Sequence, residues 1–317
     1  MDKSELLQLL SQDSQAKRYG AGEAIVREGE PATEGLGFIL SGSARVIQTH
    51  EGQRVQVGGI QAGQFFGETA LVLARPRMAT VEAETPETTV LFQSPAQFRA
   101  NIANNYPFLE MLVRHTIQRV EHVIGALARL DARQELSIDP SLCAKIIENR
   151  RHNLLLQEML NHTRSTWVGK DNPVFRQDDR NDGQIYLVVK GRIGVYRDFD
   201  KQHQKLLTLE EGDMFGYSRK ETASFRKYSA RTEEDSARVI SFDIELMERL
   251  LRMSQEQFYY FFRSIVTQLV ILDDGLRMAG LARMRSPVVT ETDKPLTGAV
   301  EYSEPDALEI EATPPPV

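Results

Sequence analysis

Residues Phe66 to Val81 read FGETALVLARPRMATV, and the interpretation of the whole chain starts from this stretch. Gly67 lets the backbone turn tightly and aim N–H groups at one anion. Glu68 to Leu73 predicts a short helical turn, whose free amides favour negative charge at its start. Arg77 can offer paired N–H bonds to phosphate oxygens. Glu68 repels a phosphate but can accept a hydrogen bond from a sugar hydroxyl, so the stretch favours a sugar phosphate ligand.

The pattern FGExAL followed by PRxAT resembles the phosphate-binding cassette of cyclic nucleotide-binding domains, and the similarity covers roughly Ala16 to Leu130. The resemblance implies that Glu68 binds the ribose 2′-hydroxyl and that Arg77 binds the cyclic phosphate. It also implies that the backbone amides of Gly67 and Ala79 help to bind the phosphate, and that Leu71 is an apolar contact that moves on binding. From the residues alone, a turn with a surface salt bridge is the alternative. The candidate ligand-binding residues are Phe66, Gly67, Glu68, Thr69, Leu71, Arg77, Met78 and Ala79.

The residue after the cassette arginine bears on the choice of base. In related domains that favour cyclic GMP, a threonine often stands there and its hydroxyl binds guanine. Here the position is Met78, whose thioether is a weak acceptor and cannot donate. The resemblance therefore implies cyclic AMP as the preferred ligand over cyclic GMP, with no cofactor and no metal.

The cassette landmarks recur once, 149 residues further along the chain. The matched pairs are Gly42 and Gly191, Gly63 and Gly212, Phe66 and Phe215, Gly67 and Gly216, and Arg77 and Arg226. A fixed offset predicts two copies of one fold. The resemblance implies an α+β, mainly β class: two jelly-roll β-barrels, each followed by long helices.

The second copy departs from the pattern at the positions that carry the chemistry. Tyr217 stands in the place of Glu68, and Tyr228 in the place of Ala79. A phenol brings no charge, and a bulky ring crowds the approach of phosphate. A possible second site consists of Gly216, Tyr217 and Arg226. We interpret it first as a vestigial site kept for packing, and binding of a different anion is the alternative.

Length and composition fit two domains with extensions, because 317 residues at 41% hydrophobic content can fill two cores. We expect a nucleotide-binding domain over residues 1–132, a helical linker over 133–163 and a degenerate second domain over 164–286. Residues 288–317 hold seven acids and one lysine, so they carry −6 of the net charge of −7. With several prolines as well, residues 287–317 are predicted to be a disordered acidic tail.

Cys143 is the only cysteine, which excludes an intramolecular disulfide. No apolar run reaches the length of a membrane-spanning helix, and the first fifteen residues lack a secretory cleavage pattern. These observations favour a cytoplasmic protein that does not contact a membrane.

Two apolar seams predict long helices after the two copies. The first holds Val113, Ile117, Val120, Ile124 and Leu127, and the second Phe258, Phe262, Ile265, Leu269, Leu272, Leu276 and Ala279. Such seams favour a homodimer, although the two helices could also pack on each other within one chain. His115 and His122, on the first helix, are expected at the surface.

The sequence contains no recognisable set of nucleophile, base and orienting residue, no cluster of metal ligands and no P-loop of the kind that binds nucleoside triphosphates. Residues Asp139 to His162 give one helical pattern in place of a DNA-reading motif. Tandem domains of this kind resemble the regulatory subunits of cyclic-AMP-dependent protein kinases, without their docking helices and pseudosubstrate. We therefore expect a non-enzymatic receptor that signals through helix rearrangement to an effector protein. A ligand-independent interaction scaffold is the alternative, and a transcription regulator ranks third.

Overall fold

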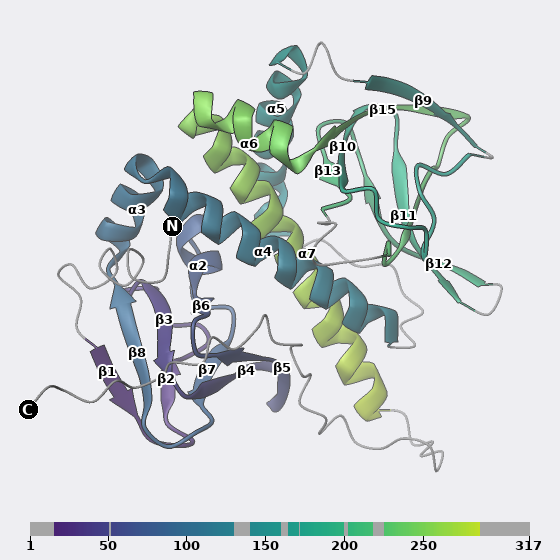
Figure 1. The fold of residues 1–317 in the computed structure, drawn as a ribbon. Helices are drawn as coiled ribbons and strands as arrows, with labels where there is room; N and C mark the ends of the chain where they lie inside the picture. The colour runs from purple at the N-terminus through teal and green to yellow at the C-terminus, as the bar shows by residue number, and fades with distance from the viewer. Residues whose placement is uncertain are drawn as a thin grey trace, which may run out of the picture.

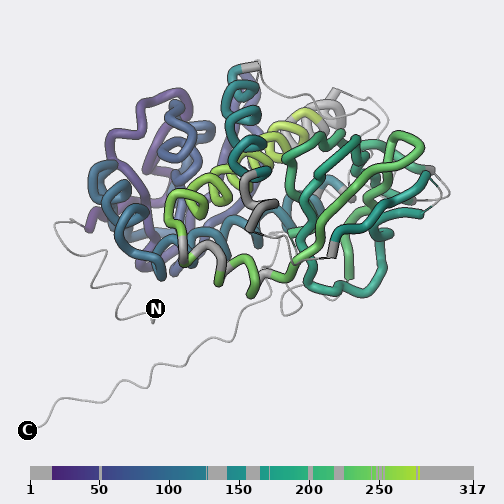
Figure 2. The backbone as a smooth tube through the Cα atoms, turned by 90° about the horizontal axis from the view of Figure 1, so that it is seen from above, coloured from purple at the N-terminus to yellow at the C-terminus, as the bar shows by residue number. Residues whose placement is uncertain are grey.

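The computed structural model describes residues 16–50, 52–129, 140–159, 164–170, 172–199, 202–217 and 225–285. Two antiparallel β-barrels lie on either side of a layer of helices, as Figure 1 and the view from above in Figure 2 both show. The mainly β fold with long helices agrees with the predicted class. The N-terminal segment and the predicted acidic tail, residues 287–317, lie outside the described residues.

The first barrel is built from two four-stranded sheets, in the orders β1-β8-β3-β6 and β2-β7-β4-β5, and every pairing is antiparallel. Apolar residues from both sheets fill the space between them. The strands are β1 (Ala16–Tyr19), β2 (Ala24–Val26), β3 (Leu36–Ser41), β4 (Ser43–His50), β5 (Gln53–Gln61), β6 (Phe65–Phe66), β7 (Thr80–Ala83) and β8 (Thr88–Gln93).

The second barrel repeats this plan with the sheet orders β13-β10-β15-β9 and β12-β11-β14. The counterpart of β2 is reduced to a single bridge between Phe175 and Ala230, which match Val26 and Val81 at the same offset. The strands are β9 (Arg164–Gly169), β10 (Gln184–Lys190), β11 (Ile193–Phe199), β12 (Gln202–Leu209), β13 (Met214–Phe215), β14 (Ser229–Thr232) and β15 (Ser236–Asp243).

The helices follow the same repeat. Their bounds are α2 (Glu68–Val72), α3 (Pro95–Asn104), α4 (Tyr106–Arg129), the 3-10 helix η1 (Pro140–Leu142), α5 (Cys143–Met159), α6 (Ile244–Met253) and α7 (Gln255–Arg285). Helices α6 and α7 begin 149 residues after α3 and α4. A capping box formed by Ser94 and Gln97, with Pro95 at the first helical position, fixes the start of α3.

Helices α4 and α7 pack against each other between the barrels (Figure 1). All five residues of the first seam are buried, as are the residues of the second seam from Phe258 to Leu272. The side chains of Leu276 and Ala279 lie outside the described ones. The two seams are therefore buried by the packing of α4 on α7 within one chain. The sequence had left this arrangement open beside a homodimer. The homodimer stays a prediction, and the seams no longer argue for it.

One continuous apolar cluster runs from the first barrel through α4 and α7 into the second barrel. Helix α5 fastens α7 to that barrel, because Asn149 donates to Thr267 on α7 at 3.2 Å and Asn153 donates to the Gly212 carbonyl at 2.9 Å. Within the described residues, none of the helices combines the length and the apolar character needed to cross a membrane.

Candidate nucleotide-binding site

The cassette sits where β6 ends and α2 begins. Gly67 joins the two with a φ of 86°, in the left-handed region that glycine adopts most readily. The glycine is needed for space as well, because a Cβ at this position would lie 2.2 Å from Nη1 of Arg77. The predicted short helical turn is present as α2, although it ends at Val72, with Leu73 as its C-cap.

Arg77 is brought to this turn by the loop that precedes β3. Its backbone pairs with that loop at Gly29 and Glu30 over 2.9 and 2.8 Å. Its guanidinium, only 3% exposed, donates from Nη1 to the Gly67 carbonyl at 3.2 Å and from Nη2 to the Gly35 carbonyl at 2.6 Å. Burial lowers the pKa of Arg77, and nearby carboxylates oppose this effect. The side chain is therefore held rigidly beside the start of α2.

Glu68 turns away from solvent and is paired from the long helix. Its side chain is 1% exposed and forms an ion pair with Arg119 on α4. The Thr69 hydroxyl donates to Glu68 Oε1 at 3.1 Å. Burial is the largest influence and would raise the pKa of Glu68, but Arg119, together with smaller contributions that include His115 and the Thr69 hydroxyl, holds the pKa below its usual value. The residue is therefore an ionised acceptor inside the protein.

Arg119 also connects the cassette to α7. Its Nη2 lies 3.7 Å from Oδ2 of Asp273, so carboxylates from α2 and α7 flank one guanidinium. Burial raises the pKa of Asp273 to about 6, with Arg119 opposing and the charge of Glu68 adding to the rise. Neither Arg119 nor Asp273 is among the sequence-predicted site residues. The only sequence signal for Arg119 is its position next to the seam residue Val120.

His115 corrects an expectation. It was predicted at the surface, but its Nε2 atom is buried and has no hydrogen-bond partner among the described residues. Its ring lies edge-on to Phe65 at 6.2 Å. Burial and then the charge of Arg119 lower its pKa to about 4, so the imidazole is neutral at physiological pH. His115 and His122 are both half-buried as residues. The Nε2 atom of His115 is enclosed on the side of α4 that lies against Phe65 of the first barrel.

The other predicted residues lie around this centre. Phe66 is buried in the barrel core, edge-on to Phe92 at 6.0 Å, so it supports the turn from behind. Leu71 and Met78 are half-buried against the apolar cluster of the helical layer, and Ala79 is half-buried just before β7. Phe66 thus has a packing role.

The second cassette keeps the hydrogen bonds of the cassette arginine and differs at the position of Glu68. Arg226 donates from Nη1 to the Gly216 carbonyl at 2.9 Å and from Nη2 to the Gln184 carbonyl at 3.0 Å, as Arg77 does to Gly67 and Gly35 in the first copy. Tyr217 is buried against Phe261 of α7, with ring centres 6.0 Å apart.

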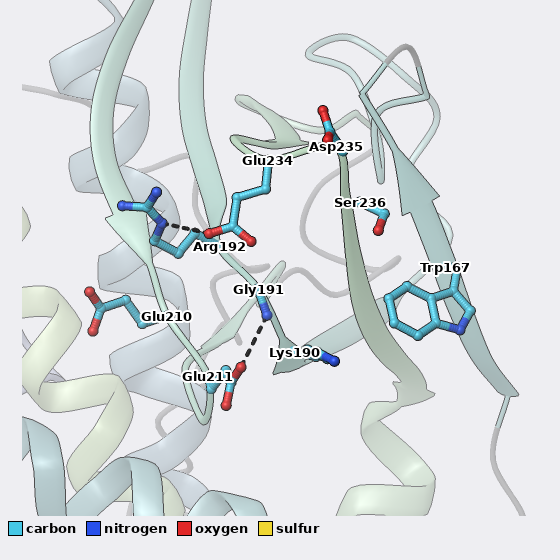
Figure 3. Close-up of a pocket in the computed structure, with 9 residues that line it drawn as sticks. All are labelled: Trp167, Lys190, Gly191, Arg192, Glu210, Glu211, Glu234, Asp235 and Ser236. Carbon is cyan, nitrogen blue, oxygen red and sulfur yellow. Dashed lines mark hydrogen bonds and ion pairs between the residues drawn. The ribbon is translucent and has the colours of Figure 1, made fainter.

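A cavity of about 720 Å³ lies at three turns of the second barrel and beside strand β9 (Figure 3). It is open to solvent at Trp167, which is 59% exposed. Its charged lining residues are Lys190, Arg192, Glu210, Glu211, Glu234 and Asp235. Arg192 is already paired with Glu234. Since carboxylates outnumber cations here, this cavity disfavours a phosphate, whereas the cassette favours one. The described residues contain no group of side chains suited to hold a metal ion.

Comparison with known proteins identifies the repeated unit. The sequence model of the cyclic nucleotide-binding domain family matches residues 16–105 and 166–254, together more than half of the chain. A cAMP-dependent protein kinase type II regulatory subunit of Drosophila melanogaster is 40% identical over 68 residues, 22% of this chain and 18% of the relative. A cAMP-dependent protein kinase regulatory subunit of Mycosarcoma maydis is 38% identical over 74 residues, 23% of this chain and 14% of the relative. The chain thus matches less than one fifth of the length of either relative.

Solved structures show a looser likeness. The regulatory domain of Toxoplasma gondii PKA with cAMP has 18% identity and a TM-score of 0.29, over 81% of this chain and 87% of that one. The Thermus thermophilus catabolite activator protein has 23% identity and a TM-score of 0.30, over 41% of this chain and 67% of that one. At such scores these structures add nothing to the family match, on which the assignment rests.

Proposed function

Because this chain belongs to the cyclic nucleotide-binding domain family, we propose that its first domain is a receptor site for a cyclic nucleotide. In this proposal Arg77 and the Gly67 amide bind the cyclic phosphate, and Glu68 binds the ribose 2′-hydroxyl. Thr69, Leu71, Met78 and Ala79 border the ligand.

One observation carries the proposal. Two buried atoms of the cassette have no hydrogen-bond partner among the described residues: Nε of Arg77, a donor, and Oε2 of Glu68, an acceptor. A buried polar group without a partner costs free energy, so such groups mark a place where a ligand is expected. A cyclic nucleotide offers an anionic acceptor for Arg77 and a hydroxyl donor for Glu68, which matches both needs.

We propose cyclic AMP as the physiological nucleotide. Met78 cannot donate to guanine as a hydroxyl does, which removes one basis for preferring cyclic GMP. The two relatives reported above are named as subunits of cAMP-dependent kinases, and this supports the same choice.

The signal is proposed to travel through α4 and α7. Glu68 and Arg77 are almost fully buried, so a nucleotide reaches them only if the surrounding helices move. Glu68 is paired with Arg119 of α4, and the Tyr259 hydroxyl of α7 donates to the Val72 carbonyl at the end of α2 at 3.3 Å. A ligand that binds one arrangement of these contacts better than another shifts the population towards it.

We propose that the receptor is cytoplasmic and non-catalytic, and that the second domain and the acidic tail engage an effector protein. The names of the relatives make a protein kinase the first candidate for that partner. The domain boundaries expected from the sequence, including the helical linker over 133–163, belong to this proposal. A ligand-independent scaffold is the competing function, and the unpartnered cassette atoms argue against it.

Isothermal titration of the full chain with cyclic AMP and then cyclic GMP tests the proposal. The expected result is one site per chain that prefers cyclic AMP. Absence of binding by either nucleotide would favour the scaffold, and two sites would mean that the second cassette is open.

The variant Arg77→Ala tests whether the nucleotide binds at the first cassette. Loss of one partner of a buried charge pair weakens binding by roughly 2 to 5 kcal/mol. Arg192→Ala is the matched control, because it removes an arginine from an exposed turn of the second barrel. Unchanged affinity of the Arg77 variant would remove this residue from the phosphate site.

A further inference from the structure

In the described part of the second cassette, the arginine and the glycine of the first cassette keep their backbone geometry. Arg226 pairs through its backbone with Asp178 and Asp179 over 2.9 and 2.8 Å, the same two bonds and the same distances that Arg77 makes in the first copy. Gly216 has a φ of 76° and matches Gly67. The guanidinium of the arginine and the backbone N–H of the glycine therefore occupy equivalent positions in the two barrels.

In the second copy, two side chains of the protein already occupy that place. Asp182 forms an ion pair with Nη2 of Arg226. The Tyr228 hydroxyl oxygen accepts the Gly216 N–H at 2.8 Å. At the matching positions the first copy has Thr33 and Ala79, and neither side chain can supply a carboxylate or a phenol. The carboxylate of Glu34 does lie near Arg77, but its Oε2 is 3.9 Å from Nη2, too far for a hydrogen bond.

The carboxylate is itself held in position. Asp182 Oδ1 accepts the Gln184 N–H at 3.0 Å, and the Tyr186 hydroxyl donates to Oδ2 at 3.1 Å. Arg226 is further held by the Phe175 ring, whose centre lies 4.4 Å from its guanidinium carbon. Asp182 is 49% exposed, so its pair with Arg226 gains little from burial. Its advantage is that a tethered carboxylate is always present, whereas a free anion must be bound from solution.

We propose that the second cassette is an anion site closed by the protein's own side chains. The Asp182 carboxylate takes the place of an anionic ligand oxygen on Arg226, and the Tyr228 hydroxyl takes the place of a second ligand oxygen on the Gly216 amide. The ligand class excluded in this way is a small phosphate or phosphate ester.

Tyr217 is a third difference between the two cassettes, because it stands in the place of Glu68. Where Glu68 holds an ionised carboxylate paired to α4, Tyr217 places a buried ring against Phe261 of α7. The ring contact between Tyr217 and the long helix is thus apolar, whereas its hydroxyl is buried without a hydrogen-bond partner among the described residues. In the second domain Asp182 and Tyr228 thus bind Arg226 and the Gly216 N–H, whereas the equivalent positions of the first domain hold Thr33 and Ala79.

Inorganic phosphate is the probe for the test, read by the backbone amide resonance of Gly216 in the full chain. The double variant Asp182→Thr, Tyr228→Ala gives the second copy the residues of the first at these two positions. In the wild type we expect no saturable shift of the Gly216 signal with phosphate, and in the double variant a saturable one. Either a saturable shift in the wild type or none in the folded double variant overturns the proposal.

A milder variant covers the case in which the double variant does not fold. Tyr228→Phe keeps the ring and removes only the acceptor of the Gly216 N–H. Hydrogen exchange of the Gly216 amide is expected to accelerate about two- to tenfold, as for the loss of one hydrogen bond. An unchanged exchange rate would overturn the assignment of this contact. Both readouts concern Gly216 alone, so they stand or fall separately from nucleotide binding at Gly67.

Discussion

Replacing Asp273 by asparagine is expected to stabilise the protein at neutral pH. The carboxyl of Asp273 lies on α7, where burial is the main reason that its pKa is raised to about 6, and the nearby charge of Glu68 adds to the rise. Arg119 opposes the shift but stands 3.7 Å away. Asparagine cannot ionise, so the variant avoids the cost of a charge in this position.

The size of the effect follows from the two pKa values. A carboxyl with a pKa of about 6 in the folded chain and about 3.9 in the unfolded chain costs about 3 kcal/mol once both states are ionised. Asp273 is 20% exposed, and asparagine also loses the long ion pair with Arg119. We therefore expect a net gain of about 1–2 kcal/mol at pH 7.5.

The pH dependence carries a definite sign. Between about pH 4 and pH 6 the unfolded chain has released this proton while the folded chain keeps it, so the wild type loses stability as the pH rises. The loss is complete above the folded pKa. The advantage of Asp273→Asn should accordingly shrink to about one third at pH 4.5.

Urea unfolding followed by circular dichroism at pH 7.5 and pH 4.5 measures both quantities. Asp274→Asn, which removes one negative charge from the adjacent position of α7, controls for the change in net charge. The reasoning fails if the Asp273 variant is less stable than the wild type at pH 7.5, or if its gain is the same at both pH values.

Gly67→Ala should weaken cyclic AMP binding at least tenfold and destabilise the chain by about 1–2 kcal/mol, because a Cβ is strained in the left-handed backbone and collides with Arg77. Isothermal titration measures the affinity and urea unfolding the stability, and an affinity equal to that of the wild type would contradict the prediction. Arg119→Gln should cost about 3–5 kcal/mol by leaving the buried carboxylate of Glu68 unpaired, and an unchanged urea midpoint would show that the pair contributes nothing. Tyr259→Phe should lower stability by about 0.5–1.5 kcal/mol through loss of its bond to the end of α2, with a midpoint equal to the wild type as the refuting result.

The local parts of the site could be predicted from sequence because their signals are local. A glycine needed for a left-handed turn and an arginine ten residues later lie close together along the chain, and their recurrence at one offset exposed the repeat. The structure bears out that offset down to individual hydrogen bonds of Arg77 and Arg226.

The parts that sequence missed depend on tertiary packing. Arg119 reaches Glu68 across 51 residues, and Asp273 joins them only because α7 lies on α4. An apolar seam predicts that a helix packs against another helix, but it does not identify that helix. The same spacing of apolar residues suits a helix of a second chain and a helix of the same chain. His115 was misjudged for a related reason: a polar residue beside a seam turns inward when the barrel covers that side of the helix.

The packing of α4 on α7 joins equivalent helices of the two copies. In a two-chain assembly such a contact dissolves on dilution, whereas covalent linkage makes it independent of protein concentration. A duplicated and fused gene also escapes the rule that every substitution in a symmetric dimer appears twice. Tyr217 and Tyr228 can therefore stand in one half while Glu68 and Ala79 stand in the other, so each half of the chain can change without the other.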